Sequence, residues 1–127
     1  MCEIRFYVCE HCGNIVGLIH NAGVPMMCCG TKMVELVPNT EEASVEKHLP
    51  VVKVEDDKVY VEIGSTPHPM VEEHHIVWVY LQTDRGGQRK CLEIGSAPEV
   101  AFALCDEKPV AVYAYCNLHG LWKTDVQ

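Results

Sequence analysis

The sequence predicts a mainly β chain, in which a small, metal-stapled N-terminal domain precedes an antiparallel β-sandwich of immunoglobulin-like architecture. Three observations support this prediction. Four of the eight cysteines lie near the N-terminus in two close pairs. About seven short alternating segments bounded by turns follow them. Histidines recur where these segments begin or end. A chain of 127 residues has room for one small and one medium domain.

The first domain, residues 1–36, is rich in cysteine and glycine and short of apolar core residues. We expect short strands over residues 6–8 and 15–16, on either side of a turn that carries Cys9-x-x-Cys12. Adjacent Cys28 and Cys29 are poorly placed to bond to each other, but both can reach one metal ion. A unit this small needs such a staple, and its four sulfur ligands suit iron or zinc.

The second domain, residues 37–127, begins with a linker over residues 37–40. We expect Asn39 or Thr40 to cap a short helical turn over residues 41–46. The apolar and β-branched pattern after Pro50 then changes to that of strands. Strands are predicted over residues 51–54, 58–63, 75–81, 89–94, 100–104 and 109–115.

Five candidate metal ligands lie where these strands end and loops begin, and loops at one end of a sandwich can converge. Four imidazoles and one thiolate are too many for a tetrahedral structural zinc site. They suit a five-coordinate redox metal such as iron, with a sixth position open for chemistry on a small oxygen species. The five candidates are His48, His68, His74, Cys116 and His119.

The candidate ligands differ in how strongly the pattern supports them. A single histidine in a β-protein is more often a surface residue than a ligand. Cys116-x-x-His119 is a stronger signal, because both side chains can reach one metal from one turn. His74 and His75 are adjacent, and residues alternate across a strand, so only one of the two can easily point into the site.

Charge and hydropathy limit the classes of function. The net charge of −8 disfavours a nucleic-acid binder, which normally presents a basic face. No apolar run reaches membrane-spanning length, and no secretory signal is visible at the N-terminus. Clustered cysteines then indicate metal ligation in a reducing compartment, so we expect a cytoplasmic protein without a membrane or nucleic-acid partner.

The order of these motifs resembles that of desulfoferrodoxin, the two-iron form of superoxide reductase. The first domain is similar to desulforedoxin and the second to the neelaredoxin-type catalytic domain, so the resemblance covers essentially the whole chain. The strings that carry it are Cys9-Glu10-His11-Cys12-Gly13-Asn14, Cys28-Cys29-Gly30, Glu46-Lys47-His48-Leu49-Pro50, His68-Pro69-Met70 and Cys116-Asn117-Leu118-His119-Gly120.

The resemblance implies two iron ions per chain. A rubredoxin-like iron is held by Cys9, Cys12, Cys28 and Cys29, although zinc also suits these ligands. A second iron lies in a square of imidazole nitrogens, with Cys116 as the axial thiolate. The register from His68 to Trp78 selects His74 over His75 as a member of the square, which also contains His48, His68 and His119.

The resemblance also implies a reaction, the one-electron reduction of superoxide to hydrogen peroxide, which detoxifies superoxide under oxidative stress. We expect Lys47 to attract superoxide and to hold a protonating water, and the resemblance implies that Glu46 occupies the open iron position in the resting oxidised state. We expect rubredoxin or a similar small carrier to return the electron, and the resemblance implies that the chain forms a homodimer. No nucleotide-binding fingerprint indicates direct use of NAD(P)H. The alternative is a non-enzymatic electron carrier that uses only the four-cysteine site.

Overall fold

The computed structural model describes residues 3–127, which divide into two compact units, Glu3–Val37 and Pro38–Gln127. The smaller unit forms two little sheets, in the strand orders β2-β1-β5 and β3-β4. Its only buried residues are Phe6, Cys9 and Met33. With so few buried side chains, the unit depends on something other than an apolar core for stability. Its strands are β1 Arg5–Val8, β2 Ile15–Leu18, β3 Met27–Cys28, β4 Thr31–Lys32 and β5 Val34–Glu35.

The larger unit is an antiparallel sandwich of two sheets, in the orders β10-β7-β6 and β12-β11-β8-β9. One short helix precedes the first strand. These elements are α1 Val45–His48, β6 Pro50–Glu55, β7 Lys58–Ile63, β8 Ile76–Thr83, β9 Gly86–Cys91, β10 Glu99–Ala103, β11 Pro109–Cys116 and β12 Gly120–Asp125.

The core of the sandwich follows from the two-residue alternation of its strands. In β7, the buried residues Val59, Val61 and Ile63 alternate with exposed ones. They join apolar residues of β8, β10 and β11 in one buried cluster, so the two sheets pack face to face. Cys116 belongs to this cluster and is fully buried. The predicted fold class is confirmed.

Two local predictions are wrong. The helical turn expected over residues 41–46 lies at Val45–His48, and its N-cap residue is Ser44. Asn39 is not a cap, because its side chain bonds to both backbone groups of Lys123. The strand β12 was not expected at all, although Trp122 faces the interior beside β11 and is 2% exposed. The short strands β3, β4 and β5 were not expected either, and the remaining strands lie within a few residues of their predicted bounds.

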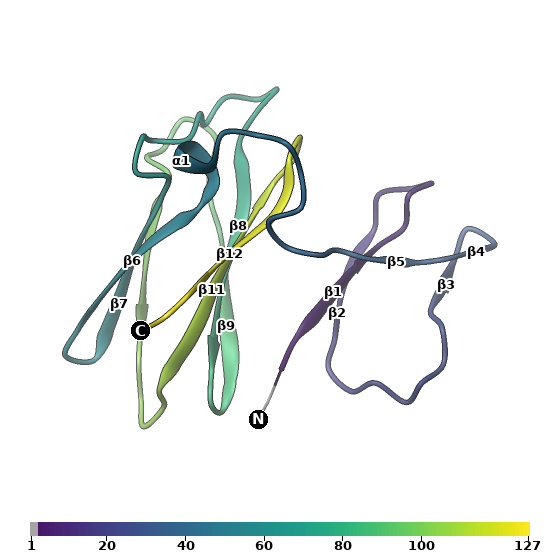
Figure 1. Cartoon of the computed structure of the whole chain (residues 1–127), viewed down its shortest axis with the longest axis horizontal. Helices are drawn as coiled ribbons and strands as arrows, with labels where there is room; N and C mark the ends of the chain where they lie inside the picture. Colours follow the sequence, from purple (N-terminus) through teal and green to yellow (C-terminus); the bar gives the residue numbers. More distant parts are fainter. Residues whose placement is uncertain (1–2) are drawn as a thin grey trace. The chain divides into compact units, whose positions relative to one another are not determined.

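Antiparallel connections bring four ligand-bearing segments to one end of the sandwich. They are α1, the loop after β7, the segment before β8 and the turn between β11 and β12, all at the upper end of the sandwich in Figure 1. No helix among the described residues is long and apolar enough to cross a membrane.

Candidate metal centres

His48 closes helix α1 and points into the upper end of the sandwich, where it is 2% exposed. Its ring Nδ1 donates a hydrogen bond to the backbone oxygen of Ser44, one turn earlier, at 2.6 Å. Because a carbonyl oxygen can only accept, this bond places the ring proton on Nδ1 and leaves a lone pair on Nε2.

His68 is fixed in the same way by the loop after β7. It is 2% exposed, and its Nδ1 donates to the backbone oxygen of Pro69 at 2.7 Å. The loop is anchored to α1 at Gly64, which has a φ of 85°. A Cβ built there meets the backbone oxygens of Thr66 and Lys47, so no other residue fits without displacing one of these segments.

The other two imidazoles lie at the end of the second sheet, one before β8 and one in the turn between β11 and β12. His74 lies just before β8, in a bridge to Val71. His119 follows Cys116 by three residues, and Trp122 Nε1 donates to the backbone oxygen of His119 at 3.0 Å. Neighbouring His75 instead turns its Nδ1 to the backbone oxygen of Val71 at 3.0 Å. Of the adjacent pair, His74 therefore lies in the cluster.

The four rings form a square. Neighbouring ring centroids lie between 4.5 Å apart, for His68 and His74, and 5.1 Å apart, for His74 and His119, whereas the diagonal from His48 to His74 is 6.0 Å. His48 Nε2 lies 3.2 Å from His68 Nε2 and 3.1 Å from His119 Nδ1. Four nitrogens bound at about 2.1 Å to one ion would have neighbours about 3.0 Å apart. The spacing therefore fits a metal ion at the centre.

The protonation of these rings supports the same conclusion. Burial lowers the pKa of His48 and His74, and it lowers that of His68 to about 4. Near neutral pH the lone pairs of His48 and His68 therefore face each other with no proton between them. Nε2 of His74 is buried and has no hydrogen-bond partner among the described residues. A cation bound among these nitrogens would satisfy their lone pairs.

Cys116 supplies a sulfur atom to this cluster. Its Sγ lies 3.9 Å from Nδ1 of His119, and one potential ligand atom from each of His48, His68, His74 and Cys116 lies within 4.8 Å of the others. Burial raises the pKa of the Cys116 thiol, while the backbone N–H groups of Leu118 and His119 lower it. These two groups are hydrogen-bond donors to the sulfur, and they would moderate the electron donation of a bound thiolate.

The charged pair before His48 lies at the surface. Glu46 and Lys47 are both exposed, and neither takes part in the two salt bridges found within residues 3–127. The positive charge of Lys47 contributes to lowering the pKa of both His48 and His74. The backbone of Glu46 is held firmly, since Thr66 N and Ser65 Oγ both donate to its oxygen, at 3.0 and 3.2 Å.

The smaller unit brings its four predicted cysteine ligands together. The Sγ atoms of Cys9, Cys12, Cys28 and Cys29 all lie within 4.8 Å of one another, with 3.6 Å between Cys12 and Cys28. Sulfurs bound tetrahedrally at about 2.3 Å would be about 3.8 Å apart. Cys91 and Cys105 lie outside both clusters as exposed free thiols, and Cys2 lies outside the described residues.

The thiols of this cysteine cluster differ in pKa, so they differ in how readily they lose a proton to bind a metal. Hydrogen bonding from the backbone of Cys12 lowers the pKa of Cys9 to about 6. Hydrogen bonding to Cys12 raises the pKa of Cys29 to about 12. The free cluster therefore keeps some sulfurs protonated, and a metal must displace those protons when it binds.

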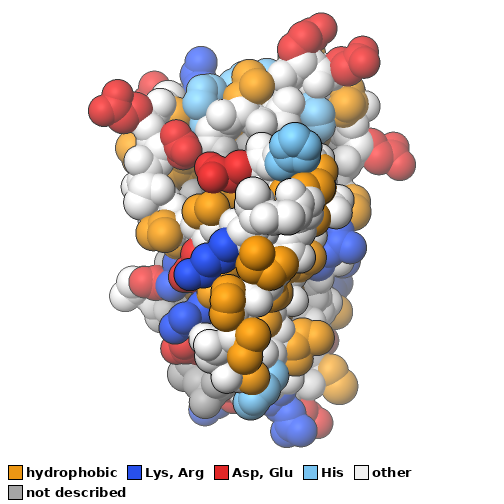
Figure 2. Space-filling model, turned by 90° about the vertical axis from the view of Figure 1, so that its right-hand side faces the viewer, with side chains coloured by type: hydrophobic (Ala, Val, Ile, Leu, Met, Phe, Trp, Pro, Cys, Tyr) orange, Lys and Arg blue, Asp and Glu red, His pale blue; other side chains and the backbone are white. Residues whose placement is uncertain are grey.

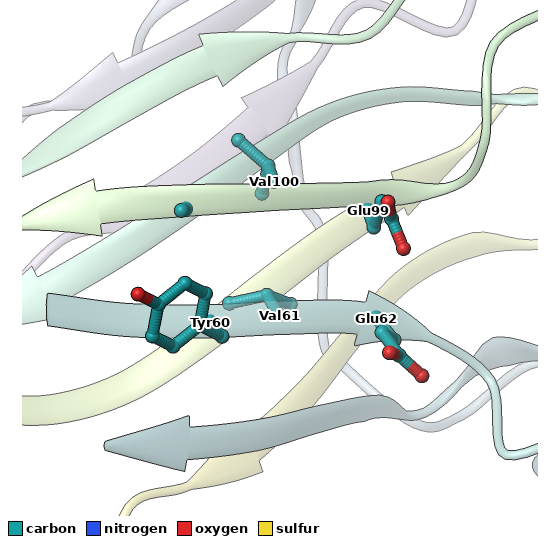
Figure 3. A pocket seen from close by; sticks show the side chains of 6 residues that line it. Tyr60, Val61, Glu62, Glu99 and Val100 are labelled. Atoms are coloured by element: carbon teal, nitrogen blue, oxygen red, sulfur yellow. The ribbon is translucent and has the colours of Figure 1, made fainter. Parts of the chain in front are cut away.

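A separate hollow of about 310 Å³ lies over β7 and β10 (Figure 3). Its lining includes Tyr60, Glu62 and Glu99, and the two carboxylates lie side by side on neighbouring strands. Tyr60 and Glu62 alternate with the core residues of β7, so the hollow opens on the outer face of the sheet. It contains no histidine or cysteine and is not part of either cluster.

Sequence patterns did not identify several groups that position the ligands. The acceptors for His48 and His68 are backbone oxygens of Ser44 and Pro69, which leave no trace in residue type. Gly64 was detectable in principle, because a single glycine directly after a strand pattern often marks a close backbone approach.

Comparison with known proteins gives a consistent result. The family model described as Desulfoferrodoxin matches residues 40–125. The desulfoferrodoxin of Syntrophotalea carbinolica is 42% identical over 123 residues, which are 97% of each chain. The solved superoxide reductase of Treponema pallidum has a TM-score of 0.82 and 39% identity, and the match covers 97% of this chain and 99% of that one. The 1Fe superoxide reductase of Giardia intestinalis has a TM-score of 0.56 and 32% identity, over 65% of this chain and 98% of its own.

The buried imidazoles predict a specific pH dependence for the metal-free protein. Folding lowers the pKa of His68 from 6.5 to about 4, so below pH 6.5 the unfolded chain binds a proton that the folded chain does not. The free energy of unfolding should be highest above this value and should fall as the pH falls toward about 4. His48 and His74 shift in the same direction and add to the effect.

Thermal unfolding of the metal-free protein across this pH range measures the effect. His68→Gln should flatten the decline, while His20→Gln, at an exposed histidine of the smaller unit, should leave it as in the wild type. A wild-type unfolding temperature that does not change over this range would contradict the prediction.

Proposed function

The chain belongs to the desulfoferrodoxin family, and we infer that it is a superoxide reductase that works at the cluster of His48, His68, His74, Cys116 and His119. One observation carries this inference: four imidazoles form a square, with a buried cysteine as the fifth donor. These five residues would hold an iron ion and leave room beside it for a small oxygen species. The iron would supply one electron, and superoxide would also take up two protons to become hydrogen peroxide.

We propose that Cys116 would be the sulfur ligand of this iron. A thiolate ligand would supply electron density to the metal. The N–H groups of Leu118 and His119 lie against the sulfur and weaken that donation. Such moderation favours release of intact hydrogen peroxide over cleavage of its O–O bond.

Lys47 is proposed to attract superoxide and to hold the water that protonates the product. The chain carries a net charge of −8, so an anionic substrate needs a local cation. Lys47 is exposed and next to His48, and its charge acts on two rings of the square. Its neighbour Glu46 offers a carboxylate oxygen, and we propose that it occupies the free iron position in the resting oxidised state.

The four-cysteine cluster is proposed to bind a second iron, which gives two iron ions per chain. Its sulfur spacing also suits zinc. Either metal would stabilise a unit that has only three buried side chains among its described residues. Iron there could in addition carry electrons by an outer-sphere route.

Several features support proposals about cell context and partners. All seven described cysteines are free thiols, which suits a reducing cytoplasm. A small carrier such as rubredoxin is the proposed electron donor. Hydrophobic side chains form a band on the face of the smaller unit that Figure 2 presents, and a homodimer would cover part of this surface. The exposed large apolar residues of this unit are Ile19, Val24, Met27, Val34 and Val37.

The alternative of a pure electron carrier is not favoured. It requires the histidines to be incidental, whereas three of them converge with Cys116 and the fourth lies against His48. Dismutation of superoxide is a different alternative, which the products distinguish, because it releases dioxygen and reduction does not.

The product ratio tests the reaction directly. When the reduced, iron-loaded protein meets a limited amount of superoxide, each superoxide should give about one hydrogen peroxide and no dioxygen, and about one iron should be oxidised per superoxide. Simultaneous measurement of peroxide, dioxygen and iron oxidation provides this ratio. A yield of one peroxide and one dioxygen for every two superoxides would show dismutation instead.

The role of Lys47 predicts a loss of rate that depends on salt. Lys47→Gln should slow the second-order reaction with superoxide about three- to tenfold at low ionic strength, because the local positive potential is lost. The difference should shrink as salt screens the charge. Rapid mixing or pulse radiolysis of the reduced protein measures this rate constant.

Lys58→Gln is the matched control, since it removes the same charge at the opposite end of β7 from the site. It should react at close to the wild-type rate. Equal slowing by both substitutions would assign the effect to net charge and would contradict a local role for Lys47.

A further inference from the structure

Asn117 follows Cys116 directly, and its side chain bridges the turn to the segment that carries His74. Its Oδ1 accepts from the backbone N–H of His75 at 2.9 Å, and its Nδ2 donates to the backbone oxygen of Glu73 at 3.0 Å. Its own backbone N–H donates to the oxygen of His75 at 3.2 Å. One residue therefore holds the backbone on both sides of His74.

His74 differs from two other imidazoles of the square in how its ring is held. The rings of His48 and His68 each donate from Nδ1 to a backbone oxygen. Within residues 3–127, the ring of His74 makes no hydrogen bond, and its Nε2 is buried without a partner. Apart from its contacts with the neighbouring rings, the orientation of His74 therefore depends on its backbone, which Asn117 holds in place.

We propose that Asn117 is a positioning residue that sets the position of Cys116 relative to His74. The proposal rests on the proposed iron site at these residues. Cys116 directly precedes Asn117 in the chain. The side-chain amide of Asn117 bonds to the backbone of Glu73 and of His75, the two neighbours of His74. A shift of the amide therefore changes the position of one ligand relative to the other.

The turn that contains Asn117 also positions the N–H groups that donate to the sulfur of Cys116. Leu118 and His119, whose N–H groups face Cys116, follow Asn117 directly. The three hydrogen bonds of Asn117 keep this turn against the 73–75 segment. Loosening the turn should therefore change both iron retention and the electronic environment of the thiolate, because contacts around the ligands tune both properties.

Asn39 provides a matched control within the same unit. Its Nδ2 donates to the oxygen of Lys123 at 3.1 Å and its Oδ1 accepts from the N–H of Lys123 at 2.9 Å. This is the same pair of amide-to-backbone bonds, made to a residue that is no ligand candidate. Because Asn39 has a φ of 63°, glycine is the substitution that removes its side chain without backbone strain.

The experiment compares wild type, Asn117→Ala and Asn39→Gly as full-length, iron-loaded proteins. A chelator is added, and loss of the visible thiolate-to-iron band of the oxidised second site is followed over time, with the four-cysteine absorption as an internal reference. Asn117→Ala should lose this iron about tenfold faster than wild type, and its band should move. Asn39→Gly should keep the wild-type band and rate, although both variants should unfold at lower temperature.

Each result has one meaning for the proposal. Faster iron loss with a moved band in Asn117→Ala alone supports it. Wild-type band and release rate in Asn117→Ala, or the same changes in Asn39→Gly, would overturn it and leave Asn117 as a structural residue. A wild-type protein that shows no thiolate-to-iron band would instead overturn the proposed iron site itself.

Discussion

The lone pairs of two buried imidazoles, those of His48 and His68, face each other at the end of the sandwich. The packing of the sandwich holds the two rings in these positions. Two hydrogen bonds to backbone oxygens, from His48 and His68, fix which nitrogen carries the proton. Their Nε2 atoms then lie 3.2 Å apart with no proton to share. Such an arrangement is unfavourable until a cation binds, so metal binding and folding of this end are energetically linked.

The sandwich provides the rigidity that this arrangement requires. Cys116 is the last residue of β11 and part of the main apolar cluster, so its sulfur is packed as firmly as any core side chain. The loop after β7 is anchored at Gly64 against the backbone of Lys47, which places His68 and the segment before His48 relative to each other. The side chain of Lys47 is exposed, while its backbone N–H donates to the oxygen of Ser44.

Much of this organisation could be predicted from the sequence, because strand alternation and ligand type are local properties. The strands around Val59 and Val79, the cysteine pairs of the small unit and the positions of the histidines at strand ends all follow from local pattern. Convergence of the ligands could not be derived in this way, since it depends on strand order. Only a resemblance to known proteins implied it.

What the sequence did not provide is also physically understandable. The helix at Val45–His48 has no side-chain cap, and Asn39 bonds to Lys123, far away in sequence, so local capping rules misplaced the helix. The strand β12 was missed because the polar residues that follow Trp122 interrupt the apolar pattern expected of a buried strand. The choice of His74 over His75 depends on bonds between Asn117 and a segment over forty residues away, which local alternation alone leaves open.

The most direct test is the oxidised-minus-reduced visible spectrum of the iron-loaded protein beside that of Cys116→Ser, with iron counted in both. A five-ligand site with an axial thiolate predicts that the variant loses a charge-transfer band and about one iron per chain, while the absorption of the four-cysteine site survives. Identical spectra and iron contents in the two proteins would show that Cys116 is not a ligand and would contradict the account of this site.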